Sequence, residues 1–350
     1  MEFGPWVITN VSGTLTPVER NVTWSSSYHI FSVDNPCTVG FNYPGTCNIT
    51  VTESAEIQVY NFLTGFFSQF KQLSTYPFYV FGESYAGKYV PYVAYEILTR
   101  GAQGYNFSGF GIGNAWTDPL VQIEVFSRMS YAANIIDPHY RRVVEEYQVQ
   151  GRIDMLNNSF PSATNMFNVI ENLLTEVNLT AGIFLNNYED YSATEPLIAL
   201  YDLTQPYLNS TSVKESYGIP ADFNYTLCNS DVYNWFADDF MQSAAEILSF
   251  VISNTKVLMF NGADDIEVNT GGVIDFLREL SWPGIKDFVK SERMIWNSTQ
   301  GVLGAAKYST NLTFVTVNKA GHMVPFYQPS SALDMVTRWI NGNNNWTQPI

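Results

Sequence analysis

Apolar runs that alternate with segments of helical periodicity constrain the fold of this chain more than any other feature. Runs that read as strands occupy residues 6–11, 28–34, 77–83, 107–114, 256–262 and 312–318. Four of them are mostly apolar instead of alternating, which is typical of strands covered on both faces. Helical spacing is seen over residues 52–70, 87–100 and 331–342. The pattern predicts an α/β fold with a mostly parallel central sheet and helices on both faces.

Residues from about 120 to 245 interrupt this alternation of predicted strands and helices. Helical patterns at 140–156 and 166–177 have little strand character between them. We interpret this stretch as a helical insertion, or cap, within one α/β domain that covers residues 1–350.

Composition narrows the class of partner. The formal net charge is −16, from 33 acidic and 17 basic residues, which disfavours nucleic acid and anionic membranes as partners. The charge suits an acidic compartment, and the equal alternative is that it serves solubility alone. No apolar run approaches the roughly 18 residues of a membrane span, and the first residues do not resemble a signal peptide.

Many N-x-S/T sequons are spread along the chain, and they favour a glycoprotein of the secretory pathway, either lysosomal or vacuolar or extracellular. They begin at Asn10, Asn21, Asn48, Asn106, Asn157, Asn178, Asn209, Asn224, Asn297, Asn311 and Asn345. Cys37 and Cys47 flank a turn-rich segment and are a candidate local disulfide in an oxidising compartment, the alternative being two free thiols. Cys228 is then left without a partner.

The stretch YPFYVFGESYAGKYVP, residues 76–91, reads as a strand, a sharp turn and a helix. Ser84 stands at the turn, where a nucleophile would project clear of the sheet. The small residues Gly82, Ala86 and Gly87 allow a tight turn and close packing of the helix on the strand. The strict nucleophile-elbow pattern is G-x-S-x-G, and here Ala86 occupies the last position. A buried structural serine is the alternative interpretation.

A catalytic serine needs a base and an orienting acid. His322 lies on a glycine-containing loop after a strand, where catalytic groups are often presented. Asp264 and Asp265 follow another strand. The order Ser84, aspartate, His322 is that of α/β-hydrolases, but the residues alone do not choose between the two aspartates. The other histidines read as structural; they are His29 and His139.

These segments resemble the motifs of the serine carboxypeptidase family, of the carboxypeptidase Y and cathepsin A type. GESYAGKYVP (82–91) is similar to the nucleophile motif, and AGHMVP (320–325) to the histidine motif. GADDIEVN (262–269) is similar to the acid motif, with Ala263 replacing an aspartate. GIGNAWTDP (111–119) and VDNPCTVGFNY (33–43) match further motifs. The resemblance covers nearly the whole chain and is weakest in the helical insertion.

The resemblance implies roles for individual residues. Ser84 would be the nucleophile, and His322 the general base and then the general acid. Asp265 would orient the histidine, because alignment of the motif selects it over Asp264. The backbone N–H of Tyr85 would be one donor of the oxyanion hole.

The resemblance also implies a site for the substrate's terminal carboxylate, formed by Glu83 and, in the segment EFGP, Glu2. A carboxylate binds another carboxylate only if a proton is shared, so such a site works best at acidic pH. Glu2 would otherwise be read as a disordered terminal residue. Met323 would line the pocket for the leaving residue, the alternative being a core methionine.

In the family, a loop W-L-N-G-G-P-G-C-S-S precedes the segment that matches EFGP. It supplies the second oxyanion N–H and a cysteine that pairs with the position of Cys228. The resemblance therefore implies that the sequence lacks an N-terminal section. We expect the chain as written to fold poorly or to work weakly, since one oxyanion donor is worth about 3–4 kcal/mol.

The expected function is that of a serine-type carboxypeptidase, a hydrolase that releases C-terminal residues from peptides through an acyl-enzyme. Its partners would be peptide or protein C-termini, and neither a metal nor an organic cofactor would take part. Two alternatives stay open. One is a catalytically weak or inactive glycoprotein that acts as a binding or protective partner, and the other is an acyltransferase that uses the same triad.

Overall fold

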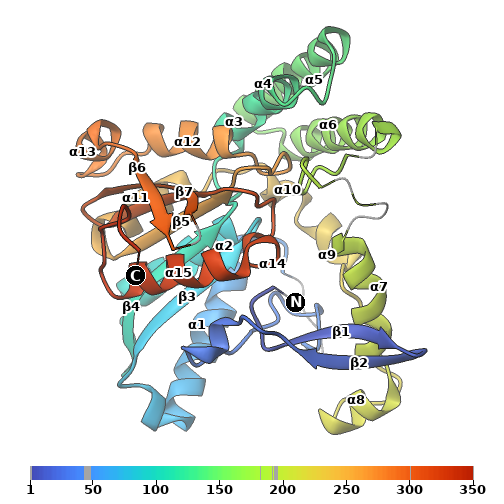
Figure 1. The fold of residues 1–350 in the computed structure, drawn as a ribbon, viewed down its shortest axis with the longest axis vertical. Coiled ribbons are helices and arrows are strands. Elements are labelled where there is room, and N and C mark those ends of the chain that lie inside the picture. Colours follow the sequence, from blue (N-terminus) through green and yellow to red (C-terminus); the bar gives the residue numbers. More distant parts are fainter. Residues whose placement is uncertain are drawn as a thin grey trace.

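A six-stranded sheet forms the centre of the computed structural model, which describes residues 2–42, 49–181, 183–190, 192, 196–299 and 301–349. The strand order is β3-β4-β5-β8-β7-β6, and Figure 1 shows helices packed around this sheet. Four strands run parallel: β3 (Pro77–Glu83), β4 (Asn106–Gly113), β5 (Val257–Gly262) and β8 (Leu312–Val317). The other two are antiparallel, namely β7 (Gly301–Ser309) and β6 (Met294–Ser298).

Helices cover the sheet on both faces. Alternate side chains of β5 point to opposite sides, so that Met259 lies in one apolar core and Leu258 in another. The first core includes residues of α2 (Ala86–Arg100), α11 (Ala245–Asn254) and α12 (Thr270–Glu279). The second includes residues of α15 (Pro329–Ile340). Both β5 and β8 are buried along their whole length, as their apolar sequences predict.

The chain between β4 and β5 is largely helical. Its helices before α11 are α3 (Pro119–Gln122), α4 (Phe126–Ala132), α5 (Pro138–Leu156), α6 (Phe160–Ala181), α7 (Pro196–Leu208), α8 (Thr211–Ser216), α9 (Ser230–Trp235) and α10 (Ala237–Phe240). α5 and α6 pack against each other. The interpretation of about 120–245 as a cap stays a prediction.

The expected strand at 28–34 is wrong, since this segment takes part in none of the strand pairings of the described residues. Its aromatic side chains pack instead. The Phe31 ring stacks on Phe66 of α1 (Thr52–Gln69), with ring centroids 4.5 Å apart, and on Phe78 of β3. Aromatic residues therefore mimic a strand pattern here while they cover a helix.

Residues 6–11 do form a strand, but one outside the central sheet. β1 (Trp6–Val11) pairs with β2 (Thr14–Glu19) as an antiparallel hairpin that lies beside α7 (Figure 1). The remaining helices are α13 (Ile285–Lys290) and α14 (Val324–Tyr327), with 3-10 turns at Trp24–Ser26, Lys71–Leu73 and Ile123–Val125. Among the described residues, no helix combines the length and apolarity needed to cross a membrane.

Candidate active site

Ser84 follows β3 directly and has a left-handed backbone, with φ of 60°. Three main-chain hydrogen bonds hold this conformation. The Ser84 N–H donates to the Gly113 carbonyl at 3.0 Å, and the Ser84 carbonyl accepts from Gly87 N–H at 2.8 Å and Trp116 N–H at 2.9 Å. A strained residue at a strand-to-helix turn is the geometry of a nucleophile elbow.

The residues around the turn must be small, because larger side chains would collide with neighbouring atoms. A Cβ on Gly82 would lie 2.5 Å from Cβ of Ala86, and one on Gly87 would lie 2.7 Å from the backbone nitrogen of Trp116. Because real Cβ contacts are not this short, helix α2 can pack on β3 and β4 only with these residues. Ala86 in place of the expected glycine fits against Gly82.

The structure brings Asp265 and His322 together. Asp265 Oδ2 lies 2.8 Å from His322 Nδ1, and both residues are buried. Nδ1–H then donates to the carboxylate, which leaves Nε2 as the acceptor of a proton. Asp264, the competing aspartate, has no hydrogen-bond partner at Oδ2 among the described residues, and burial raises its pKa to about 6. The geometry therefore favours Asp265 for the acid.

Asn114 is a site residue that sequence reasoning missed. Its Nδ2 donates to Asp265 Oδ2 at 2.6 Å, and its Oδ1 accepts from the Gly262 N–H at 3.3 Å. The other carboxylate oxygen of Asp265 accepts from the Val268 N–H at 3.0 Å. The available signal was the position of Asn114 after β4, at the same sheet edge as the acid.

A segment of the chain between α6 and α7 braces the loops that carry both residues. The His322 N–H donates to the Asn186 carbonyl at 2.6 Å. The Ile266 N–H donates to the Leu185 carbonyl, and the Tyr188 N–H to the Asp264 carbonyl, each at 3.0 Å. The acid and base loops are thus hydrogen-bonded to one shared strip of backbone.

Ser84, Asp265 and His322 follow β3, β5 and β8, so they meet at the carboxyl edge of the parallel strands. Among the hydrogen bonds of the described residues, none joins the Ser84 hydroxyl to His322. Burial lowers the pKa of His322, and the charges of Asp265, Glu267 and, least of the three, Glu83 at the end of β3 raise it. The other two histidines, His29 and His139, are exposed.

Glu83 and Glu2 form a carboxyl pair at this edge. Burial raises the pKa of Glu83 well above its usual value, and the neighbouring charge of Glu2 raises it further. Burial also raises the pKa of Glu2, whose side chain hydrogen-bonds with Glu83. Arg20 Nη1 donates to the Glu2 carbonyl at 3.0 Å, so Glu2 is held in place. The pair retains a proton in a range where isolated carboxyls ionise.

Two further carboxyl groups near His322 escaped sequence reasoning, Glu171 of α6 and Glu267 after β5. Burial and the charge of Glu267 raise the pKa of Glu171 to about 8. Burial of the imidazole lowers the pKa of His322, but the charges of Asp265 and Glu267 outweigh it and raise that pKa well above its usual value. No sequence pattern places α6 beside the loop after β5.

The remaining predicted residues lie as follows. Among the described residues, no group accepts a hydrogen bond from the Tyr85 backbone N–H. This donor is therefore available to a substrate. Met323 is buried at the start of α14, and its role stays a prediction. Cys37 is disulfide-bonded, whereas Cys47 lies outside the described residues. The described residues contain no cluster of side chains suited to a metal ion.

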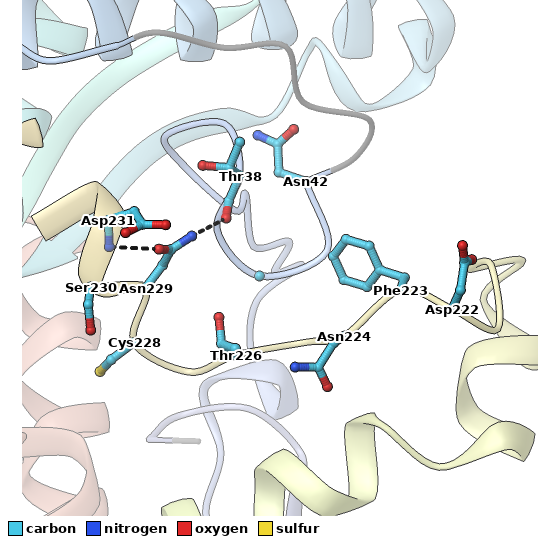
Figure 2. Close-up of a pocket in the computed structure, with 11 residues that line it drawn as sticks. Thr38, Asn42, Asp222, Phe223, Asn224, Thr226, Cys228, Asn229, Ser230 and Asp231 are labelled. Carbon is cyan, nitrogen blue, oxygen red and sulfur yellow. Dashed lines mark hydrogen bonds between the residues drawn. The ribbon is translucent and has the colours of Figure 1, made fainter.

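A cavity of about 650 Å³ lies beside Cys228, and none of the candidate triad residues lines it. Figure 2 shows its polar lining, which includes Thr38, Asn224 and Asn229. Cys228 is a free and exposed thiol. Burial, followed by the charges of Cys228, Glu267 and Glu2, raises the pKa of Tyr201 in α7 to about 12.

Comparison with known proteins gives a consistent result. A family model described as serine carboxypeptidase matches residues 1–342. The chain is 29% identical to a probable serine carboxypeptidase CPVL of Dictyostelium discoideum, over 97% of this chain and 69% of that protein. It is 30% identical to carboxypeptidase Y of Candida albicans, over 98% of this chain and 64% of that protein. The chain thus spans about two thirds of the length of these relatives.

A solved structure shares the architecture. The prohormone-processing carboxypeptidase Kex1 of Saccharomyces cerevisiae superposes with a TM-score of 0.82 at 22% identity, over 97% of this chain and 79% of that one. This likeness, with the observed sheet, confirms the predicted α/β-hydrolase fold.

Proposed function

This chain belongs to the serine carboxypeptidase family, and from that membership we propose that it hydrolyses peptides at their C-terminal bond with Ser84 as nucleophile. The observation that carries the proposal is the buried Asp265–His322 hydrogen bond at the sheet edge where the left-handed Ser84 stands. Acid, base and nucleophile in this order support acyl-transfer chemistry.

The reaction proceeds in two steps, acylation of Ser84 and hydrolysis of the acyl-enzyme. Ser84 Oγ attacks the scissile carbonyl carbon while His322 Nε2 takes the hydroxyl proton, and the Tyr85 N–H stabilises the oxyanion. Collapse of the tetrahedral intermediate breaks the C–N bond, and His322 returns the proton to the leaving amine. Water then attacks the acyl-enzyme, with His322 as base, and releases Ser84. Asp265 holds the imidazole in the required tautomer throughout.

The Glu2–Glu83 pair accounts for exopeptidase selectivity. A protonated carboxyl in this pair donates to the substrate's terminal carboxylate, and a peptide without a free C-terminus gains nothing there. As pH rises through the raised pKa of Glu83, the pair ionises and repels the substrate. Binding is therefore favoured at acidic pH.

We assign the protein to the secretory pathway. Several sequon asparagines are exposed, including Asn10, Asn21 and Asn345, and Cys37 is disulfide-bonded. Expression in eukaryotic cells, followed by glycosidase treatment and gel electrophoresis, tests this; an unchanged mobility would contradict it.

The proposed reaction is tested with wild-type protein and a Ser84→Ala variant. An active-site fluorophosphonate should label Ser84, as located by peptide mass spectrometry, and the wild type should release the last residue of a blocked dipeptide. Ser84→Ala should lose both. Protein that folds but neither reacts at Ser84 nor cleaves the dipeptide would refute the proposal and favour a binding role. Transfer of the acyl group to an added alcohol in preference to water would favour the acyltransferase alternative.

A further inference from the structure

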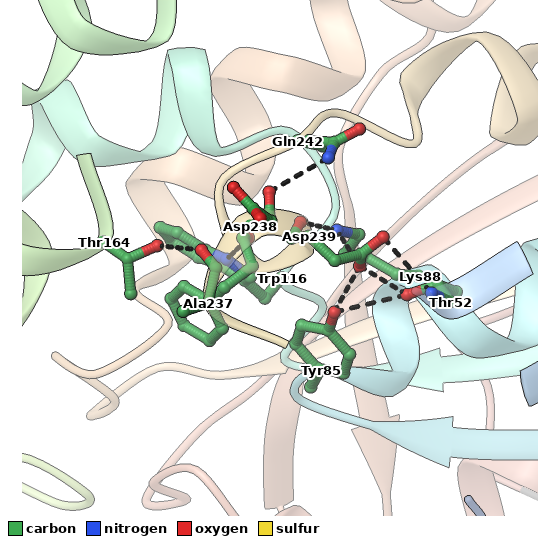
Figure 3. Close-up of polar contacts among 10 residues, drawn as sticks. Thr52, Tyr85, Lys88, Trp116, Thr164, Ala237, Asp238, Asp239 and Gln242 are labelled. Carbon is green, nitrogen blue, oxygen red and sulfur yellow. Dashed lines mark hydrogen bonds and ion pairs between the residues drawn. The ribbon is translucent and has the colours of Figure 1, made fainter. Parts of the chain in front are cut away.

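A buried polar cluster centred on Asp239 includes the side chain of Tyr85, the residue that follows Ser84 (Figure 3). Asp239 belongs to the four-residue helix α10. Its Oδ2 accepts hydrogen bonds from Lys88 Nζ and Thr52 Oγ1, each at 2.6 Å, and from the Tyr85 hydroxyl. Its Oδ1 accepts from the Thr52 N–H at 3.2 Å. Both carboxylate oxygens therefore accept hydrogen bonds, three at Oδ2 and one at Oδ1.

The cluster joins segments that are far apart in sequence. Thr52 begins α1, Tyr85 is the residue after the nucleophile, and Lys88 lies in the first turn of α2. Asp239 and Lys88 are 6% and 2% exposed, and Thr52 is 1% exposed. An ion pair shielded in this way has a well-defined geometry, and neither partner is readily lost without the other.

The charges are consistent with this hydrogen-bond pattern. Burial alone would raise the pKa of Asp239, but the Lys88 ammonium and the hydrogen bonds lower it below its usual value. Burial raises the pKa of the Tyr85 phenol well above its usual value, and the Asp239 carboxylate raises it further. The Tyr85 phenol thus stays protonated and donates a hydrogen bond to the Asp239 carboxylate.

Helix α10 is itself fixed to the surrounding structure. The Phe240 carbonyl accepts from Trp116 Nε1 at 3.1 Å, and the Ala237 carbonyl accepts from Thr164 Oγ1 of α6 at 2.8 Å. The Phe240 ring stacks on the Tyr85 ring at an interplanar angle of 8°. The backbone N–H of Trp116 also donates a hydrogen bond to the Ser84 carbonyl.

We propose that Asp239 is a positioning residue for the acyl-transfer reaction, acting through Tyr85 and Lys88 on the turn that carries Ser84 and the oxyanion donor. This inference rests on the proposed function. The side chain of Tyr85 is anchored to α10, while its backbone N–H has no acceptor among the described residues. Loss of this anchor would let the residue move, and with it the N–H that must meet the oxyanion.

The donor acts on charge that develops only in the transition state, so its displacement lowers kcat and leaves KM nearly unchanged. A displacement of about 1 Å can reduce the rate about a hundredfold. A structural role alone would instead lower the amount of folded protein without changing the rate for each folded molecule.

Two variants of the whole protein test the proposal. Tyr85→Phe removes the hydroxyl but keeps the ring, the backbone N–H and the Asp239–Lys88 pair. The double variant Asp239→Asn with Lys88→Met removes the ion pair without leaving a buried charge unpaired. For each, the rate constant for labelling of Ser84 by a fluorophosphonate is measured per folded molecule, together with kcat and KM for a blocked dipeptide and the urea midpoint.

The matched control is Asp334→Asn with Arg338→Met. This pair on α15 is also closely bonded, with Arg338 Nε 2.7 Å from Asp334 Oδ2 and Arg338 fully buried, but it lies outside the cluster around the turn. Its loss should lower the urea midpoint and leave the labelling rate unchanged.

The expected result is a fall of about tenfold to a hundredfold in kcat and labelling rate for the double variant, and a smaller fall for Tyr85→Phe. KM should stay within about twofold. Equal labelling rates in the wild type and both variants would overturn the positioning role while the proposed function stands. A wild type that does not react at Ser84 would overturn both.

Discussion

Glu56 offers a direct test of how burial controls the stability of this protein. It lies in the first turns of α1, fully buried, and neither carboxyl oxygen has a hydrogen-bond partner among the described residues. Burial, with a further contribution from the charge of Glu96, raises its pKa from 4.5 to about 8. Folding therefore favours the protonated form of Glu56.

The sign and size of the effect follow from linkage. Because the folded pKa lies above the unfolded one, the stability associated with the neutral carboxyl is complete below pH 4.5 and is lost as pH rises toward about 8. One pKa unit corresponds to about 1.36 kcal/mol, so the loss at pH 7 is about 3 kcal/mol. Glu56→Gln carries no charge and removes this loss, although its buried amide costs about 1–3 kcal/mol at every pH.

The assay is urea unfolding of the wild type and Glu56→Gln, followed by circular dichroism, at about pH 4.5 and pH 7. Relative to the wild type, the variant should gain about 3 kcal/mol between the two pH values. Glu53→Gln is the matched control, since Glu53 is exposed on the same helix, and its effect should not depend on pH in this way. A Glu56→Gln difference that stays constant between the two pH values would refute the reasoning.

Three further changes address the site. Asp265→Asn should lower kcat by about 10⁴, because a neutral amide does not hold the imidazole in the tautomer that leaves Nε2 free to accept a proton. Asp264→Asn should affect kcat far less; equal losses would contradict the choice of Asp265. Glu83→Gln keeps a neutral side chain at every pH, so the rise of KM between about pH 4 and pH 8 should flatten, and an unchanged profile would remove Glu83 from the carboxylate site. Gly87→Ala places a Cβ 2.7 Å from the Trp116 nitrogen and should cost about 1–3 kcal/mol in urea unfolding, together with slower fluorophosphonate labelling; wild-type values would show that the turn relaxes freely.

Much of the position of the candidate site could be predicted because its signals are local. The apolar runs that precede Ser84, Asp265 and His322 mark buried strands, and the observed β3, β5 and β8 end where those runs end. Parallel strands bring such ends together. The small residues Gly82 and Gly87 likewise have their explanation within a few positions of the nucleophile.

What could not be predicted depends on contacts between distant segments. Asp239 reads as an ordinary acidic residue in the sequence, and only the packing of α10 brings it to Lys88. Glu171 reaches the site because α6 passes near the loop after β5. Residues 28–34 have the composition of a strand. In the structure, the Phe31 ring instead stacks on Phe66 of α1, and the segment joins neither sheet of the described residues.

The pairing of β4 with β5 has a consequence for the order of folding. Strands β3 and β4 are near neighbours in sequence, as are β8 and β7, whereas the whole helical stretch from α3 to α11 separates β4 from β5. Closing so long a loop is entropically costly and is expected to be slow. Ser84, the proposed nucleophile, lies on one side of this pairing, and Asp265 and His322 lie on the other. We therefore expect reactivity at Ser84 to appear late in folding. During refolding, labelling of Ser84 by a fluorophosphonate should recover after the helical circular dichroism signal. Simultaneous recovery would show that the two halves of the sheet form together.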